Sequence, residues 1–342
     1  MKYPKIMQVI EFLVEKKIVT SSIFSFTRII TDKYNEKHRY YHNLDHIEYV
    51  LNYYKDTVFE NIHEEIYFYI SALMHDIIYY PTKYDNEFRS QLFFRELCKQ
   101  KYFNLKTVEI NFISGAILAT KEHKYNGDLN FIKLLVDADM GIINDPNINN
   151  RINWHNNIFK EYQFVSYNLF KDKRLEFLKS VNSPDIDYVK NFKPKIGLIC
   201  GSFNPYHIGH QDIIDKASKI FDKLIIGVGY NTEKTNVDTD NNFNKLKECL
   251  PFNEVITYPF TLQQLYDNIM NCYDCDLTIV RGIRNSTDLL YEQNLDKFVK
   301  RPMIYIPAKH DIDHISSSAI RAIEKADPEA VKEFLIEPYM YM

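Results

Sequence analysis

The glycines of this chain are unevenly placed, and they divide its 342 residues into two regions. Six of the nine glycines follow residue 196, at positions 197, 201, 209, 227, 229 and 282, so the first region is nearly free of them. Chains of this length usually contain more than one hydrophobic core. We therefore predict two domains, residues 1–183 and 195–342, joined at residues 184–194 by a polar, proline-containing linker.

The first region has apolar residues at helical spacing. Such a pattern is typical of amphipathic helices that pack one face against a common core. We expect an all-α helical bundle, with helices over residues 5–17, 20–34, 46–55, 62–80, 86–100, 106–121 and 154–181.

The second region alternates short apolar runs with helical stretches. The runs are KIGLIC, KLIIGVG, EVITY, DLTIV and PMIYIP. This alternation is typical of βαβ units, in which helices cover both faces of a buried parallel sheet. We therefore predict an α/β, Rossmann-like domain that binds its ligands at the carboxyl ends of its strands.

The segment ICGSFNPYHIGH, residues 199–210, joins the first predicted strand to a helix. Backbone N–H groups at a helix start favour an anionic phosphate. His207 and His210 would add hydrogen-bond donors or positive charge there. The segment is not a P-loop, because no Gly-Lys-Ser/Thr follows it.

Three later segments also follow predicted strands and carry cations or hydroxyls. They are NTEK, with Lys234; RGIRN, with Arg281 and Arg284; and HISSSAIR, with three serines at a helix start and Arg321. No evident carboxylate pair or activated nucleophile accompanies them. The set suits transfer between phosphates, where the protein positions its substrates and stabilises charge.

These four ordered segments resemble the nucleotidyltransferase superfamily with the HxGH signature. Within it, RGIRNSTDLLYE and ISSS are most similar to the phosphopantetheine adenylyltransferases, over roughly residues 195–340. The resemblance implies transfer of AMP from ATP, with Mg²⁺, to 4′-phosphopantetheine, giving dephospho-coenzyme A and pyrophosphate. It implies catalytic roles for His207, His210, Lys234 and Arg281; ATP binding by Ser202, Phe203, His210, Gly282, Arg284, Glu292, Ser316, Ser317 and Ser318; and acceptor binding by Ser202, Lys234 and Arg281.

Two features of the same region favour another acceptor. Asn204 stands where that family usually has aspartate, and asparagine is common there in enzymes that adenylylate nicotinamide or nicotinate mononucleotide. The segment TNVDTDNNFNKLKECL, after Lys234, replaces an arginine-bearing helix of the family. Ordinary surface positions are the alternative for Glu292 and Arg321.

Histidine and aspartate recur along the predicted helices of the first region, in HRYYHNLDHI, ALMHDII, ATKEH and LLVDADM. Imidazole and carboxylate ligands together suit a divalent metal that activates water. A buried His-Asp pair is costly unless it is ligated or hydrogen-bonded. A single His-Asp dipeptide is weak evidence for a metal site, because the second region contains such a dipeptide too, His310-Asp311. The ordered set is what counts.

This set resembles the HD superfamily of metal-dependent phosphohydrolases, over about residues 5–180. The resemblance implies hydrolysis of a nucleotide or related phosphate ester, with Mn²⁺, Fe²⁺, Co²⁺, Ni²⁺ or Mg²⁺ bound. The last ligand is assigned to Asp139 and not to Asp137, because the HD pattern usually has Ala-Asp followed by an apolar residue. The implied ligands are His46, His75, Asp76 (also catalytic) and Asp139. Candidates for substrate contact or ligand support are His42, Asp85, Glu87, Lys121 and His123. The alternative for His42, Lys121 and His123 is a solvated or capping role, and the alternative for Asp85-Asn86-Glu87 is a helix start capped by Asp85.

The net charge and the cysteine content limit the kinds of partner and the cellular compartment that we expect. A formal net charge of −4 without a basic block argues against electrostatic binding of nucleic acid. No apolar run approaches a membrane span, and five cysteines, including Cys272 and Cys275, are read as reduced thiols. We expect a cytoplasmic, bifunctional enzyme that acts on nucleotides and a phosphorylated acceptor, and that forms homo-oligomers as the resembling transferases often do. The alternative is that one domain is a non-catalytic binding or regulatory module.

Overall fold

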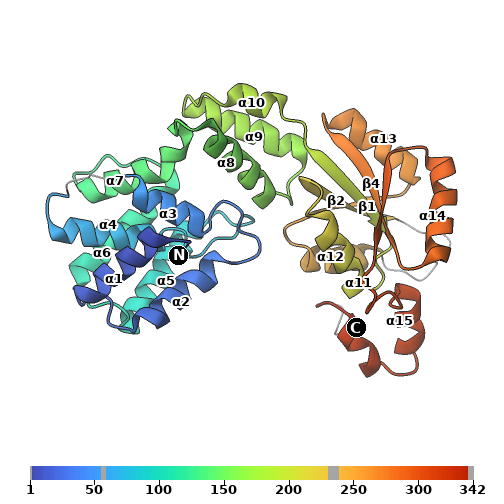
Figure 1. The fold of residues 1–342 in the computed structure, drawn as a ribbon, viewed down its shortest axis with the longest axis horizontal. Coiled ribbons are helices and arrows are strands. Elements are labelled where there is room, and N and C mark those ends of the chain that lie inside the picture. The colour runs from blue at the N-terminus through green and yellow to red at the C-terminus, as the bar shows by residue number, and fades with distance from the viewer. Residues whose placement is uncertain (1, 55–58, 230–238, 338–342) are drawn as a thin grey trace. The chain divides into compact units, whose positions relative to one another are not determined.

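The computed structural model describes residues 2–54, 59–229 and 239–337 (Figure 1). The chain forms two compact units: Met1–Glu161 with Ser183–Asp185, and Tyr162–Asn182 with Ile186–Met342. The division at Glu161 corrects the predicted boundary at residue 183. The predicted linker also contains a helix, α10 (Ile186–Asn191).

A buried lysine explains where the second unit begins. Lys223, at the first position of strand β2 (Lys223–Gly229), has none of its surface exposed. Its ammonium group donates to the carbonyl oxygens of Gln163 and Val165, the latter at 2.8 Å. The segment directly after Glu161 is therefore fastened to the sheet. The helix predicted over residues 154–181 is consequently two helices, one in each unit.

The first unit is helical, as predicted. Asparagine side chains start two of its helices, because Asn43 and Asn61 each accept backbone N–H bonds from the first turn. Their apolar faces build a core that includes the fully buried Phe26, Ile47 and Leu73. The helices are α1 (Pro4–Glu15), α2 (Ile23–Tyr34), α3 (Leu44–Asn52), α4 (Ile62–Met74), α5 (Asn86–Lys99), α6 (Thr107–Ala119), α7 (Asn130–Asp139) and α8 (Ile148–Glu161), with 3₁₀ turns η1 (Thr120–Glu122) and η2 (Met140–Asn144).

Helix α4 ends at Met74, six residues earlier than the periodicity predicts. The cause is Arg39, whose side chain is fully buried. Its Nη1 donates to the carbonyl oxygen of Asp76 at 2.6 Å, and its Nη2 donates to that of Ile77 at 3.0 Å. These carbonyls are thereby drawn out of the helical pattern, and the chain turns at His75.

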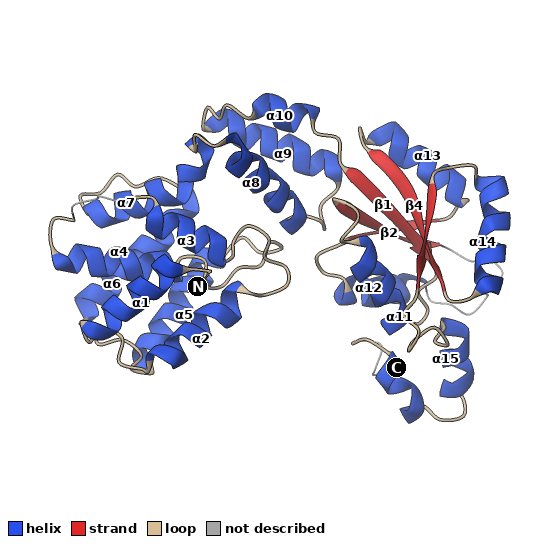
Figure 2. Ribbon diagram, viewed as in Figure 1, coloured by secondary structure: helices blue, strands red, loops and turns tan. Residues whose placement is uncertain are grey.

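The second unit contains a five-stranded parallel sheet with the order β3-β2-β1-β4-β5. Figure 2 shows α11 and α12 on one side of the sheet and α13 and α14 on the other, so the predicted α/β architecture is confirmed. Its elements are α9 (Tyr167–Ser180), α10, β1 (Lys195–Gly201), α11 (Ile208–Ala217), β2, α12 (Thr239–Cys249), β3 (Glu254–Tyr258), α13 (Leu262–Cys272), β4 (Asp276–Ile283), α14 (Ser286–Val299), β5 (Met303–Pro307), α15 (Ser317–Glu324) and η3 (Glu329–Phe334).

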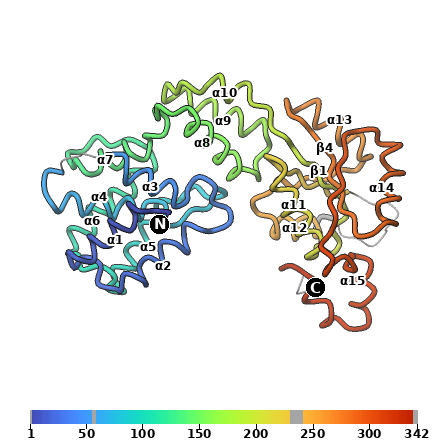
Figure 3. The backbone as a smooth tube through the Cα atoms, in the orientation of Figure 1, coloured from blue at the N-terminus to red at the C-terminus, as the bar shows by residue number. Residues whose placement is uncertain are grey.

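The strand order reverses between β1 and β4. The chain first moves from β1 towards β3, and then returns to add β4 and β5 on the other side of β1. In open α/β sheets, the crevice at such a reversal is the usual ligand site. Helices α9 and α10 precede β1 and pack against each other (Figure 3).

Candidate functional site

His207 and His210 lie at the start of α11, directly after the turn that follows β1. Nδ1 of His207 accepts the backbone N–H of Gly209 at 3.1 Å, and Nδ1 of His210 accepts the N–H of His207 at 3.4 Å. The pair is thus a reciprocal helix cap. Because each Nδ1 is an acceptor, each neutral ring carries its proton on Nε2. The three-residue spacing therefore leaves two Nε2–H donors for a ligand.

Both imidazoles are neutral near pH 7. Burial lowers the pKa of His207 to about 4, with a smaller contribution from the charge of Arg284. Burial, His207 and Arg284 together hold the pKa of His210 well below its usual range. The two rings also stack, with centroids 3.7 Å apart. The sequence predicts that these histidines add either hydrogen-bond donors or positive charge. Because both rings are neutral, they add hydrogen-bond donors.

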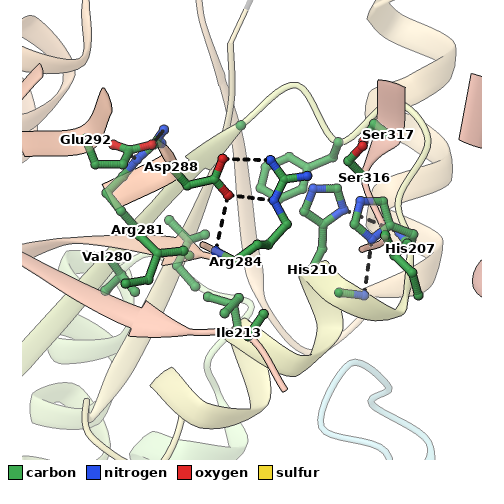
Figure 4. A pocket seen from close by; sticks show the side chains of 18 of the residues that line it. His207, His210, Ile213, Val280, Arg281, Arg284, Asp288, Glu292, Ser316 and Ser317 are labelled. Carbon is green, nitrogen blue, oxygen red and sulfur yellow. Dashed lines mark hydrogen bonds and ion pairs between the residues drawn. The ribbon is translucent and has the colours of Figure 1, made fainter. Parts of the chain in front are cut away.

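A cavity of about 360 Å³ lies over the ends of β1 and β4 (Figure 4). Its lining residues come from positions up to 118 apart in the chain, from Ile199 to Ser317. Ser202 and Ser318 are not among the lining residues, and Lys234 lies outside the described residues. The predicted residues that line it are Phe203, His207, His210, Arg281, Gly282, Arg284, Glu292, Ser316 and Ser317.

Each arginine of the RGIRN segment is held by a carboxylate. Arg281 donates from Nε and Nη2 to Glu292, both at 2.7 Å, and from Nη1 to the carbonyl oxygen of Cys200 at 2.8 Å. Glu292 is buried, so the alternative of a surface position is wrong for it. Arg284 makes a similar two-point contact with Asp288, at 2.7 and 2.9 Å (Figure 4). These pairs fix both guanidinium groups at the cavity wall.

The start of helix α15 forms the opposite wall. Ser316 is its N-cap, and its hydroxyl accepts the backbone N–H of Ala319 at 3.1 Å. Ser317 donates from its hydroxyl to the carbonyl oxygen of Pro205 at 3.0 Å. The helix start therefore faces the turn between β1 and α11, and its remaining N–H groups suit an anion.

Arg321 holds this turn in place. Its guanidinium donates to the carbonyl oxygen of Asn204 and to the hydroxyl of Ser318, the latter at 3.2 Å. The alternative of a simple surface role is therefore wrong for Arg321. Phe203, in the same turn, has a φ of 46°, and its ring lies 5.0 Å from that of His210. Non-glycine residues rarely adopt this conformation, and such strain concentrates at functional sites.

A second cluster lies in the first unit. Ligand atoms of His46, His75, Asp76 and Asp139 all lie within 4.8 Å of one another. Nε2 of His46 is 3.2 Å from Nε2 of His75 and 3.2 Å from the Asp139 carboxylate. Nδ1 of His75 contacts the carbonyl oxygen of Ala72 at 2.9 Å. That bond places the proton on Nδ1 and leaves Nε2 of His75 as a lone-pair donor.

The charge state of this cluster suits a cation. Burial alone would raise the pKa of Asp76 and of Asp139, but the neighbouring histidines outweigh burial and lower both. The cluster thus offers two anionic carboxylates and two imidazoles at one point. This donor set fits a divalent metal. Asp137, the competing aspartate, is exposed and lies outside the cluster.

Two of the predicted surrounding residues, His123 and Glu87, interact with carboxylates of the cluster. His123 has a left-handed φ of 49°, and its Nδ1 lies 3.5 Å from the Asp139 carboxylate. Burial raises the pKa of Glu87, and the charges of Asp76, Lys121 and His123 also act on it. Lys121 is exposed on η1. His123 therefore lies beside a carboxylate of the cluster.

Asp85 has a different role from those predicted. It precedes α5, but its side chain makes no capping hydrogen bond. Its carboxylate instead accepts from Nε of Arg89 at 2.7 Å, and the Asp85 side chain is about one-third exposed. Asp85 does stand at the start of α5, as the alternative reading has it, but without a side-chain cap.

His42 is held by Glu161, a residue that the sequence patterns did not single out. Nδ1 of His42 lies 2.6 Å from the Glu161 carboxylate, and its ring stacks on Tyr79 with centroids 4.0 Å apart. Burial would lower the pKa of His42, but Glu161, Asp76 and Asp139 outweigh it and raise the pKa. Arg39 and Tyr79 were also missed. Their sequence neighbours do not single them out, because Arg39 follows Lys37 and His38, and Glu161 follows Lys160.

Comparison with known proteins identifies the second unit. A family model described as cytidylyltransferase-like matches residues 198–323. A phosphopantetheine adenylyltransferase of Streptococcus uberis is 39% identical over 139 residues, which are 38% of this chain and 81% of that protein. The chain belongs to the phosphopantetheine adenylyltransferase family. The enzyme of Streptococcus sanguinis is 36% identical over 135 residues, covering 38% of this chain and 82% of its own length.

This adenylyltransferase domain accounts for the second unit only. The family model begins at residue 198 and leaves the helical unit outside. A solved structure, described as a putative nicotinate-nucleotide adenylyltransferase from Vibrio parahaemolyticus, overlaps 44% of this chain and 90% of its own. Its TM-score is 0.32 at 16% identity, which is too low to support an inference. Among the described residues, no helix is both long and apolar enough to cross a membrane.

The low pKa of His207 predicts a pH dependence for the adenylyltransferase domain. Since the folded-state pKa is about 4 and the ordinary value is 6.5, only the unfolded chain takes up a proton between these values. The free energy of unfolding should be unaffected by His207 above pH 6.5 and should fall below it, by up to about 3 kcal/mol. Hydrogen exchange of the β1 and β4 amides from pH 7.5 to 4.5 measures this. His207→Asn retains a capping oxygen without a titratable ring, so it should make the profile less steep, with the part due to His210 retained. An unchanged profile would contradict the assignment.

Proposed function

We propose that the adenylyltransferase domain transfers AMP from ATP to 4′-phosphopantetheine, forming dephospho-coenzyme A and pyrophosphate. The observation that carries the proposal is the pair of Nε2–H donors at a helix start, within a cavity that also holds two fixed arginines. Membership of the family supports the reaction, and the segment RGIRNSTDLLYE supports the acceptor.

In the proposed reaction, a phosphate oxygen of the acceptor attacks the α-phosphorus of ATP, and the bond to pyrophosphate breaks. The Nε2–H groups of His207 and His210 donate to the α-phosphate oxygens as negative charge develops on them. Ser316, Ser317 and the N–H groups of α15 bind the β- and γ-phosphates. Arg284, which is paired with Asp288, adds a fixed hydrogen-bond donor at the cavity wall. No protein nucleophile is required, because the acceptor supplies its own.

The acceptor phosphate needs cations of its own. We assign it to Lys234 and Arg281, with Ser202 as a further donor. Arg281 already shares its charge with Glu292, so its contribution is a fixed donor direction and not a full unpaired charge. Asn204, where the family usually has aspartate, favours a second candidate acceptor, nicotinamide or nicotinate mononucleotide.

We expect the full chain, given ATP and Mg²⁺, to form dephospho-coenzyme A from 4′-phosphopantetheine and to act poorly on either mononucleotide. Mass spectrometry of the products, with each acceptor supplied separately, measures this. If the chain forms a dinucleotide from a nicotinic mononucleotide and leaves phosphopantetheine unused, the assigned acceptor is wrong, but the assignment as an adenylyltransferase stands. Absence of pyrophosphate with every acceptor would favour a binding module instead.

We propose further that the helical unit is a metal-dependent phosphohydrolase of the HD type. The observation that carries this is the convergence of His46, His75, Asp76 and Asp139 within 4.8 Å. A divalent ion bound there would supply Lewis acidity and a source of nucleophilic water. The chain's own residues would do the rest: His123, which lies beside Asp139, would contact the phosphate ester together with Glu87 and Lys121.

The metal site is tested first without turnover. The purified full chain is stripped with a chelator and titrated with Mn²⁺, Fe²⁺, Co²⁺, Ni²⁺ and Mg²⁺ while binding is followed by calorimetry. One equivalent of a divalent ion per chain is expected in the helical unit. Hydrolysis of a panel of nucleotides and phosphate esters then identifies the substrate. A chain that binds no ion and hydrolyses nothing would favour a regulatory module.

A further inference from the structure

The carboxylate of Glu161 is the hydrogen-bonding centre of the loop that carries His42. Glu161 is the last residue of α8, and its side chain has no exposed surface. Its Oε1 accepts three consecutive backbone N–H groups, those of Tyr40, Tyr41 and His42, at 2.7 to 2.9 Å. Its Oε2 accepts the hydroxyl of Tyr79 at 2.9 Å. A buried carboxylate with this many donors holds its partners in one arrangement.

Oε2 of Glu161 also receives Nδ1–H of His42, at 2.6 Å. This bond, together with stacking on Tyr79 at 4.0 Å, fixes the ring in two ways. Nδ1 is occupied, so Nε2 is the nitrogen that remains for another partner. The His42 side chain is 21% exposed, and its ring lies 5.9 Å from that of His46. The remaining nitrogen is therefore on a partly open ring beside the four-residue cluster.

A phosphate ester would bring negative charge to a cluster that already contains the carboxylates of Asp76 and Asp139. A donor fixed beside the cluster would offset part of this charge and orient a phosphoryl oxygen. We propose that Glu161 is a positioning residue that presents Nε2–H of His42 to a phosphoryl oxygen of the substrate. This inference rests on the proposed phosphohydrolase.

The substitution Glu161→Gln tests the arrangement with little change of shape. The glutamine carbonyl oxygen can keep the three backbone N–H groups, but its amide group cannot accept from Nδ1 of His42 or from Tyr79. The probe is inorganic phosphate, titrated into the full chain loaded with the metal ion that it binds. Bound metal, phosphate affinity and the ¹⁵N signals of the His42 ring are measured. The same substitution at Glu65, whose carboxylate accepts only the Tyr69 hydroxyl among the bonds found, is the matched control.

We expect Glu161→Gln to retain one metal ion per chain, to bind phosphate about tenfold more weakly, and to lose the Nδ1–H signal of a ring bound to a carboxylate. His42→Ala should weaken phosphate binding at least as much, and the double variant should lose little more. Glu65→Gln should match the wild type. A wild-type chain that binds no metal would refute the hydrolase itself.

Three results would overturn the inference while leaving the hydrolase intact. The first is phosphate affinity unchanged in both Glu161→Gln and His42→Ala. The second is loss of the metal ion from Glu161→Gln, which would make Glu161 a support of the cluster and not of His42. The third is full additivity of the two substitutions. If Glu161→Gln does not fold, His42→Ala with unchanged phosphate affinity still decides against the inference.

Discussion

Replacing His210 by asparagine should lower the rate of AMP transfer by about a hundred- to a thousandfold, with a much smaller change in ATP affinity. Asparagine can place its side-chain oxygen where Nδ1 of His210 now accepts the N–H of His207, so the helix cap is retained. It has no group at the position of Nε2. The lost group is therefore the donor alone, which matters most when charge develops on the α-phosphate.

Steady-state kinetics of pyrophosphate release, with ATP and acceptor varied separately, distinguish the two effects. His210→Ala should show the same kinetic loss together with a lower stability of about 1 kcal/mol, because it also removes the cap. His310→Asn is the matched control, since the His310 ring is fully exposed on the same unit. A near-normal turnover number with only a raised Michaelis constant for ATP would show that His210 binds ATP without stabilising the reaction.

The fold of each unit followed from local patterns, but the boundary between them did not. Apolar spacing and the shift in glycine placement predicted helices and a parallel sheet, because both depend on residues close in sequence. Residues 154–181 also have helical spacing, and nothing local indicates that their apolar faces belong to different cores. Contacts between residues distant in the sequence fasten that segment to the sheet, among them the bond from the buried ammonium group of Lys223 to Val165, 58 residues away.

In each candidate site, local sequence patterns predicted some of the residues that come together and missed others. In the adenylyltransferase domain, His207 and Ser316 come from segments that follow parallel strands, and Arg281 lies near the carboxyl end of β4, so the topology itself brings them together. The pairing of Arg281 with Glu292 was not predicted, because a glutamate on a helix is usually solvated. In the helical unit, the contact between His42 and Glu161 joins residues 119 positions apart. No spacing rule connects two such positions, so packing alone reveals it.

Replacing Asp76 by asparagine should abolish both metal binding and phosphate ester hydrolysis in the helical unit, while pyrophosphate release by the adenylyltransferase domain stays at the wild-type rate. The Asp76 carboxylate lies 3.2 Å from Nε2 of His75 and 3.6 Å from Nε2 of His46. Asparagine keeps the volume but removes one of the two anions of the cluster. We expect metal affinity to fall by more than about a hundredfold, since even residues that only orient metal ligands contribute ten- to a hundredfold.

Asp137→Asn is the matched control, because Asp137 lies two residues before Asp139 on α7 and is exposed outside the cluster. It should bind metal and hydrolyse the substrate as the wild type does. Calorimetric titration of the metal gives the affinity of each variant, and the transferase assay on the same samples shows that each chain is folded and active. Asp76→Asn that still binds one equivalent of metal with wild-type affinity would remove Asp76 from the ligand set. Loss of metal with unchanged hydrolysis would instead separate the activity from the cluster, because the reaction would then have to occur elsewhere in the chain.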